Sequence, residues 1–278
     1  DKVSVKNMIR GEIISRKYLV IFMVNLAIVF LTCNLMLNVH FSPDTYDIWT
    51  TTDNNVDVHL RDGRFITAAI YQILADISIN VAKTQAVFTL IFMIGIALLT
   101  TILVNRAERY FAKKDIVRLG IVDISFLLLF HNGFIAEWYL FPEVMLMYTF
   151  SMIGIVVSSL SFVRTCESSN IQSKVKFGII SFGALLIALG TYQVSIGIYI
   201  ALILIFIFLN SNISITKKLQ NAAFGLTFGA VQCFLNVGIV KMLTYLHIME
   251  PTPRGANLQI NVILENMQKI LGQQGEII

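Results

Sequence analysis

Long apolar runs, separated by short polar connections, make up most of this chain. A helix needs about 20 mostly apolar residues to cross a lipid bilayer. Seven runs approach that length, and we predict a membrane-spanning helix in each of them: 17–39, 84–104, 119–136, 141–163, 175–191, 194–210 and 221–245. The fifth and sixth runs are short and are separated only by "TYQ" at 191–193, which predicts a tight hairpin.

The segment 65–80 shows a different pattern. Its isoleucines recur at helical spacing opposite Gln72, Asp76 and Asn80, as in an amphipathic helix. We expect this segment to lie in the outer membrane interface. The alternative interpretation is that it forms the first half of a longer second span.

The lysines and arginines are distributed unevenly among the predicted connections. If the N-terminus is cytoplasmic, the connections on the cytoplasmic side contain most of the 21 basic residues. That asymmetry is what the positive-inside rule describes. We therefore predict an all-α, polytopic transmembrane helical bundle over 1–245, followed by an extracytoplasmic loop over 246–278. We also expect the protein to continue beyond Ile278.

The composition agrees with a membrane protein. Soluble domains are about 45–50% apolar and about 25% charged, whereas this chain is 56% hydrophobic and 14% charged, with a mean hydropathy of +0.74. The three cysteines are scattered, which excludes a Cys-based zinc site or a disulfide framework. We find no glycine-rich nucleotide-binding motif and expect no nucleotide cofactor and no nucleic-acid partner.

The first outer connection is unusually acidic, with five aspartates between residues 44 and 62. Asp44 and Asp47 directly follow the first span, and Trp49 lies beside them. A carboxylate at the membrane surface can act as a general base toward a sugar hydroxyl, and two carboxylates can hold a divalent cation. The alternative is a solvated loop, because aspartate favours turns.

Further candidates lie in "RDGRF" at 61–65 and in the second outer connection. Arg61 and Arg64 offer forked donors that match phosphate oxygens, although a turn at a helix start would explain them equally. Glu137, next to Trp138, lies between apolar residues close to the membrane. Ionisable groups at such depth are costly and are usually functional, but a hydrated interfacial carboxylate is the alternative.

The last candidates lie in the third and fourth outer connections. Tyr192 and Gln193 can hydrogen bond a sugar or form a hairpin turn. Arg254 is a lone basic residue that would meet an anionic head group from outside. Asp123 lies within the third span. It is expected to be a carboxylate near enough to the inner surface to stay hydrated, and the alternative is an intramembrane relay.

These short motifs occur in an order that resembles a known family. The motifs are Asp44, Asp47 and Trp49, then Gly63, Arg64 and Phe65, then "AEWYLF" at 136–141, and finally "TYQ" at 191–193. The pattern resembles the GtrII-like glucosyltransferases, polytopic members of the GT-C superfamily that modify bacterial surface polysaccharides.

The resemblance implies a catalytic carboxylate in the first extracytoplasmic loop and a donor sugar linked to polyprenyl phosphate. The family often has two adjacent acids there, whereas Asp44 and Asp47 are three residues apart, so either can be the base. Glu137 would orient the acceptor or share a metal ion with the aspartates. Such enzymes usually have more than seven spans.

The resemblance thus predicts an inverting hexosyltransferase of the bacterial cytoplasmic membrane, with its active site facing outside. It would transfer a hexose, glucose by family, to a cell-surface polysaccharide or lipid-linked glycan. Mg or Mn at Asp44 and Asp47 is the expected cofactor, and membrane lipid is an expected partner. The expected substrate-binding residues are Trp49, Arg61, Arg64, Trp138, Tyr192, Gln193 and Arg254. A flippase or transporter for lipid-linked sugar and a polysaccharide polymerase remain as alternatives.

Overall fold

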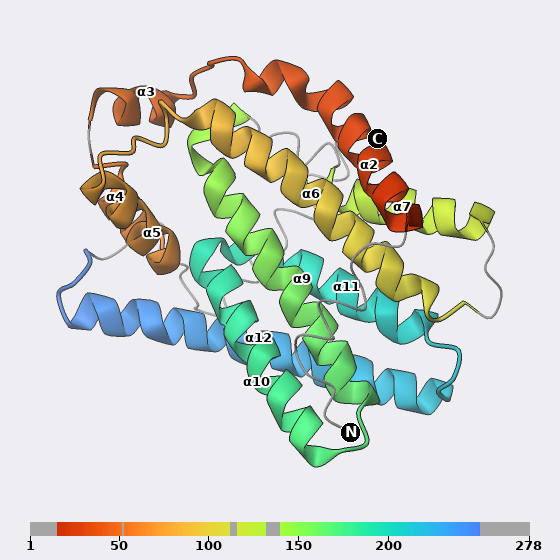
Figure 1. Cartoon of the computed structure of the whole chain (residues 1–278). Helices are drawn as coiled ribbons and strands as arrows, with labels where there is room; N and C mark the ends of the chain where they lie inside the picture. Colours follow the sequence, from red (N-terminus) through yellow and green to blue (C-terminus); the bar gives the residue numbers. More distant parts are fainter. Residues whose placement is uncertain (1–15, 52, 112–115, 132–139, 251–278) are drawn as a thin grey trace, which may run out of the picture.

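The computed structural model describes residues 16–51, 53–111, 116–131 and 140–250. Every regular element in these ranges is a helix (Figure 1). In chain order they are α2 (Arg16–Cys33), η1 (Asn34–Leu37), α3 (Pro43–Thr50), α4 (Val56–Arg61), α5 (Phe65–Asp76), α6 (Gln85–Glu108), α7 (Ile116–Phe130), η3 (Pro142–Val144), α9 (Met145–Glu167), α10 (Ile171–Thr191), η4 (Gln193–Ser195), α11 (Ile196–Leu209) and α12 (Ile215–Tyr245).

Within the described residues, five helical segments are long and apolar enough to cross a membrane. They are Arg16–Leu37, Gln85–Glu108, Pro142–Glu167, Ile171–Thr191 and Ile215–Tyr245, and each coincides with a predicted span. The predicted spans 119–136 and 194–210 correspond to α7 and α11, which have only 15 and 14 residues. Residues 132–139 lie outside the described ranges, so the count of seven spans stays a prediction.

Two spans begin earlier than predicted because polar caps start them before the apolar run. Asn170 accepts a hydrogen bond from the backbone N–H of Gln172 at the start of α10, and Ser214 does the same for Lys217 in α12. Such caps satisfy amide groups that the first helical turn leaves without partners. The first turns therefore contain lysines, whose long side chains can reach water from the membrane surface.

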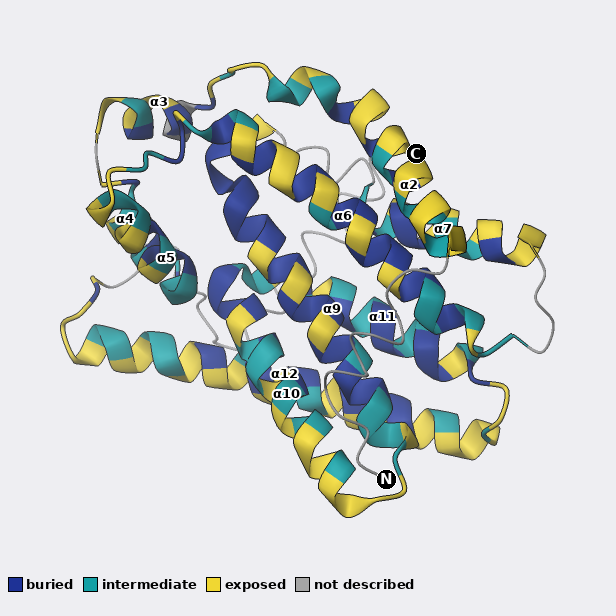
Figure 2. Cartoon of the chain, viewed as in Figure 1, coloured by how far each residue is buried: buried dark blue, intermediate teal, exposed yellow. Residues whose placement is uncertain are grey.

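Helix α9 forms the centre of the bundle, where Figure 2 shows mostly buried residues. Its contact with α10 is close because small residues line it. A Cβ added at Gly154 would lie 2.8 Å from the carbonyl oxygen of Ala184. The hydroxyls of Ser158 and Ser181 each donate to the other residue's carbonyl oxygen, at 2.9 and 3.0 Å.

Helices α2 and α12 lie at the periphery and expose apolar side chains (Figure 2). Leu31 is 74% exposed and Phe234 is 75% exposed. A water-soluble protein rarely exposes such large apolar surfaces, whereas lipid would cover them. The exposed faces of α2 and α12 thus support the assignment to a membrane.

Basic residues gather at one end of the bundle, which we call the basic end. There the Lys17 ammonium pairs with Glu108 and the Arg106 guanidinium pairs with Glu167. The described basic residues at this end are Arg16, Lys17, Arg106, Arg109, Arg118, Arg164, Lys174, Lys176, Lys217 and Lys218. These are residues that the predicted topology assigns to the cytoplasmic side.

The opposite end carries α3, α4 and α5, and we call it the α3–α5 end (Figure 1). The first outer connection is a pair of short helices, α3 and α4, where the sequence suggested a loop or turns. Helices α5 and α6 are separate, with Ser78 in the left-handed backbone region between them. Segment 65–80 is therefore not the first half of a continuous second span, and its place in the membrane interface stays a prediction.

Candidate functional site

Helix α3 places the predicted acidic pair at the α3–α5 end. Pro43 occupies the first turn, and Ser42 accepts a hydrogen bond from the backbone N–H of Thr45 at 3.0 Å. The Thr45 hydroxyl accepts from the Ser42 backbone in return, at 3.1 Å, which completes a capping box. The backbones of Asp44 and Asp47 therefore lie about one helical turn apart.

The two aspartates differ in what the structure describes of them. The Asp47 side chain is exposed at the surface of α3, where a substrate or a cation can reach it. The side chain of Asp44 is not among those that the structure describes. Trp49 is half-buried and packs edge-on against Phe41, with ring centroids 5.2 Å apart.

Glu143 is a buried carboxylate that connects α3 to the body of the bundle. It is 2% exposed and accepts hydrogen bonds from the hydroxyls of Ser42, at 3.2 Å, and Thr45. Its backbone carbonyl accepts from the Tyr71 hydroxyl of α5 at 2.5 Å. Glu143 thus fixes α3 and α5 at once, because a buried carboxylate is stable only with such partners.

The turn between α4 and α5 brings Arg64 against the third outer connection. Gly63 has a φ of +74°, which glycine adopts readily. The Gln193 amide donates to the carbonyl oxygens of Asp62 and Gly63, at 3.1 and 2.9 Å. The Arg64 guanidinium lies over the Tyr192 ring at 5.4 Å and 3.7 Å from the Asp62 carboxylate. Arg64, Tyr192 and Gln193, predicted from separate motifs, therefore form one group.

A neutral histidine lies beside this group. The His59 ring, 5% exposed, packs edge-on against Tyr71 with centroids 4.9 Å apart. Burial lowers the pKa of His59 to about 3, and the nearby charge of Arg64 adds to the effect. Neither ring nitrogen has a hydrogen-bond partner among the described residues. His59 is therefore uncharged at neutral pH.

Two tyrosines complete the buried cluster. Burial raises the pKa of Tyr71, and the negative charge of Glu143 raises it further, so its phenol stays protonated as a donor. Tyr148 of α9 packs edge-on against Tyr192, with ring centroids 4.9 Å apart. We call the set His59, Arg64, Tyr71, Glu143, Tyr148 and Tyr192 the polar–aromatic cluster.

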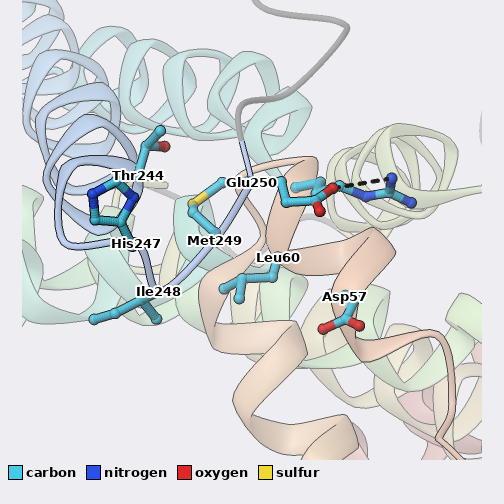
Figure 3. A pocket seen from close by; sticks show the side chains of 8 residues that line it. Asp57, Leu60, Thr244, His247, Ile248, Met249 and Glu250 are labelled. Atoms are coloured by element: carbon cyan, nitrogen blue, oxygen red, sulfur yellow. Dashed lines mark ion pairs between the residues drawn. The ribbon is translucent and has the colours of Figure 1, made fainter.

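The Arg61 side chain lies away from the polar–aromatic cluster. Its guanidinium lies 3.9 Å from the Glu250 carboxylate across a pocket of about 650 Å³ between α4 and the end of α12 (Figure 3). Both side chains are partly solvent-exposed. The structure therefore separates Arg61 from Arg64, although both belong to "RDGRF".

Three predicted site residues, Glu137, Trp138 and Arg254, lie outside the described residues. The described part of the chain holds no group of three or more His, Cys, Asp or Glu side chains that would bind a metal ion. A cation site at Asp44 and Asp47 stays a prediction, because the Asp44 side chain and Glu137 are outside what the structure describes.

Sequence reasoning missed Glu143, His59, Tyr71 and Tyr148 as site residues. Glu143 had a weak signal, because it follows Pro142 as the one charge at the start of a long apolar run. His59, Tyr71 and Tyr148 had none, because their importance comes from burial and from contacts between separate helices.

A comparison with known families finds a match over most of the chain. The family model described as Glucosyl transferase GtrII covers residues 33–273, which includes the polar–aromatic cluster and α3. No curated protein and no solved structure matches the chain.

Proposed function

The chain belongs to the GtrII glucosyl transferase family, and from this we propose that it is a GT-C type, inverting hexosyltransferase of the bacterial cytoplasmic membrane. Its donor is glucose linked to polyprenyl phosphate. Its acceptor is a cell-surface polysaccharide or a lipid-linked glycan on the outer face. The family and the membrane-length helices support a membrane glycosyltransferase.

One observation carries the assignment of the site. Three predicted motifs that are far apart in the sequence converge at the α3–α5 end: α3 with its aspartates, the turn at Arg64, and Tyr192 with Gln193. Glu143 and Tyr71 connect α3 to α5, and Arg64 directly precedes α5. A carboxylate and a guanidinium are the two groups that this transfer needs.

The proposed reaction proceeds as follows. Asp44 or Asp47 takes the proton from an acceptor hydroxyl, whose oxygen attacks the anomeric carbon of the donor. The bond between that carbon and the phosphate oxygen breaks, and the electron pair leaves with the lipid phosphate. Arg64 donates charge-assisted hydrogen bonds to the phosphate as its negative charge increases.

The contacts of the Arg64 guanidinium fix its position and leave it partly accessible to a substrate. The Tyr192 ring and the Asp62 carboxylate hold its guanidinium, and its side chain keeps 23% of its surface exposed. If a divalent cation takes part, Asp44 and Asp47 would hold it, and it would supply positive charge near the phosphate.

Substitution of the two aspartates tests the base. We expect Asp44→Asn or Asp47→Asn to lower the transfer rate by about 10²- to 10⁴-fold, the usual contribution of general-base catalysis. Asp53→Asn, a neighbouring exposed aspartate, is the control and should keep wild-type activity. Full activity in both α3 variants, with the protein still folded, would remove the catalytic role of α3.

A further inference from the structure

A pocket separate from the polar–aromatic cluster lies between α4 and the chain just after α12 (Figure 3). Helix α4 contributes Asp57, Leu60 and Arg61, which share one face because they are three and four residues apart. The other wall consists of Thr244, His247, Ile248, Met249 and Glu250. The transfer mechanism proposed above uses none of these residues.

The fold fixes the two walls relative to each other. A Cβ added at Gly63, just after α4, would lie 3.0 Å from Val240 of α12, so the two elements touch there. His247 adopts a φ of 55°, and backbone bonds from His247 to Thr244 and from Ile248 to Leu243 close the chain into a turn. Met249 is buried at 6% exposure and anchors the segment.

The charges of the lining argue against an anionic ligand. Two carboxylates, Asp57 and Glu250, oppose a single guanidinium, Arg61. A phosphate or an acidic sugar would therefore meet net repulsion. A metal ion is also disfavoured, because the lining lies among described residues that show no group of three metal-binding side chains.

The lining suits a neutral, hydroxyl-rich ligand. Carboxylate oxygens accept several hydrogen bonds from hydroxyl groups, and Arg61, Thr244 and His247 supply donors. Leu60 and Met249 offer apolar surface to the C–H faces of a sugar ring. The volume of about 650 Å³ lies within the usual range for small-molecule sites, roughly 300–1,000 Å³.

We propose that this pocket binds a neutral sugar unit of the acceptor glycan, with Asp57 and Glu250 as the hydrogen-bond acceptors for its hydroxyls. The inference rests on the proposed transferase function. The Arg61–Glu250 ion pair is long, at 3.9 Å, and Glu250 is 81% exposed. Such a pair contributes little stability, so sugar hydroxyls can replace it at small cost.

The position of the pocket also indicates the size of the acceptor. His59 of α4 packs against Tyr71 within the polar–aromatic cluster, whereas Asp57 and Arg61 of the same helix line the pocket. The pocket and the cluster thus lie on different sides of one helix, whose width is about 10 Å. An acceptor that binds in the pocket and reacts beside the cluster would have to span the width of α4, which is more than one sugar ring.

Hydrogen exchange of the full-length protein in lipid nanodiscs tests binding without relying on activity. The probes are oligosaccharides released from the surface polysaccharide of the source cells, inorganic phosphate, and Mg²⁺. We expect the oligosaccharides to slow exchange at amides of 57–61 and 244–250, and the other two probes to leave both segments unchanged. Protection by phosphate or Mg²⁺, or no protection by the oligosaccharides, would overturn the proposal.

Kinetics of two variants give the second test. Asp57→Asn and Glu250→Gln should each raise KM for the acceptor about tenfold, because each removes a charged hydrogen-bond acceptor. The kcat and the KM for the donor should stay unchanged. Asp76→Asn, an exposed carboxylate on α5 at the same end, is the matched control.

The two proposals fail in different ways. An enzyme that transfers glucose with an unchanged acceptor KM in both pocket variants would contradict the pocket assignment and leave the transferase intact. A wild-type protein that transfers nothing would contradict the transferase, while exchange protection would still report whether the pocket binds sugar.

Discussion

At the scale of single residues, Glu143 is the buried carboxylate that holds α3 in place. We expect Glu143→Gln to lower stability by about 1–3 kcal/mol, because a buried hydroxyl donor loses a charged acceptor. The transfer rate should fall as well, because the position of α3 then becomes less defined. Thermal unfolding in detergent and the transfer assay measure the two effects, with Asp76→Asn as control. An unchanged unfolding temperature would show that Glu143 does not fix α3.

We expect His59 to make the stability of the folded protein depend on pH. Its pKa falls from 6.5 in the unfolded chain to about 3 in the folded protein. Below pH 6.5 the unfolded state therefore binds a proton that the folded state does not, and stability decreases as the pH falls toward 3. The loss is about 1.4 kcal/mol per pH unit in that window.

Replacement of His59 isolates this contribution. His59→Phe should flatten the decrease in unfolding free energy between pH 6.5 and 4. Equal pH dependence in wild type and His59→Phe would contradict a buried, neutral His59.

At the scale of elements, the turn at Gly63 connects α4 to α5 and packs against Val240 of α12 and Gln193 of the third outer connection. Alanine there would meet Val240 at 3.0 Å and the Gln193 amide at 3.2 Å, and it would have to adopt a positive φ. We expect Gly63→Ala to cost about 1 kcal/mol or more and to reduce transfer, because the turn positions Arg64.

The matched control is a glycine in a helix with free space around it. A Cβ added at Gly178 of α10 meets no atom within 4 Å, so Gly178→Ala should raise stability by roughly 0.5–1 kcal/mol. Unfolding temperatures of the two variants provide the comparison. Equal effects of both substitutions would show that the turn at Gly63 tolerates a side chain.

The elements also show which parts of the fold the sequence could predict. Length and apolarity identify five of the long helices, because those two properties decide membrane insertion. Helix α3 was overlooked because its acidic composition suggested a loop, although Ser42, Pro43 and Thr45 form a recognisable helix start. Helix α4 has no such signal, because its N-cap residue, Asn55, makes no side-chain cap.

Part of the site could also be predicted from the sequence. Arg64, Tyr192 and Gln193 belong to short motifs that could be identified individually, and the fold brings them together. Glu143 and His59 act through burial, which depends on how distant helices pack. The local pattern of residues in one sequence does not show which distant helices pack against each other.

At the scale of the whole molecule, the gathering of most described basic residues at the end opposite α3–α5 predicts the orientation in the membrane. We expect an impermeant maleimide to label Asp53→Cys on intact cells, after replacement of the native cysteines by alanine. Asn212→Cys, in the connection between α11 and α12, should react only after the cells are permeabilised. The reverse pattern would place the proposed site in the cytoplasm.

We propose that the molecule adds a single hexose to an acceptor glycan from a lipid-phosphate donor. A defined acceptor is incubated with purified polyprenyl-phosphate glucose and the protein in proteoliposomes, and mass spectrometry then measures the mass of the acceptor. We predict that the acceptor gains the mass of one hexose residue and that Arg64→Ala abolishes most of the gain. An unchanged acceptor, as a flippase would leave it, or a ladder of products, as a polymerase would make, would contradict the account.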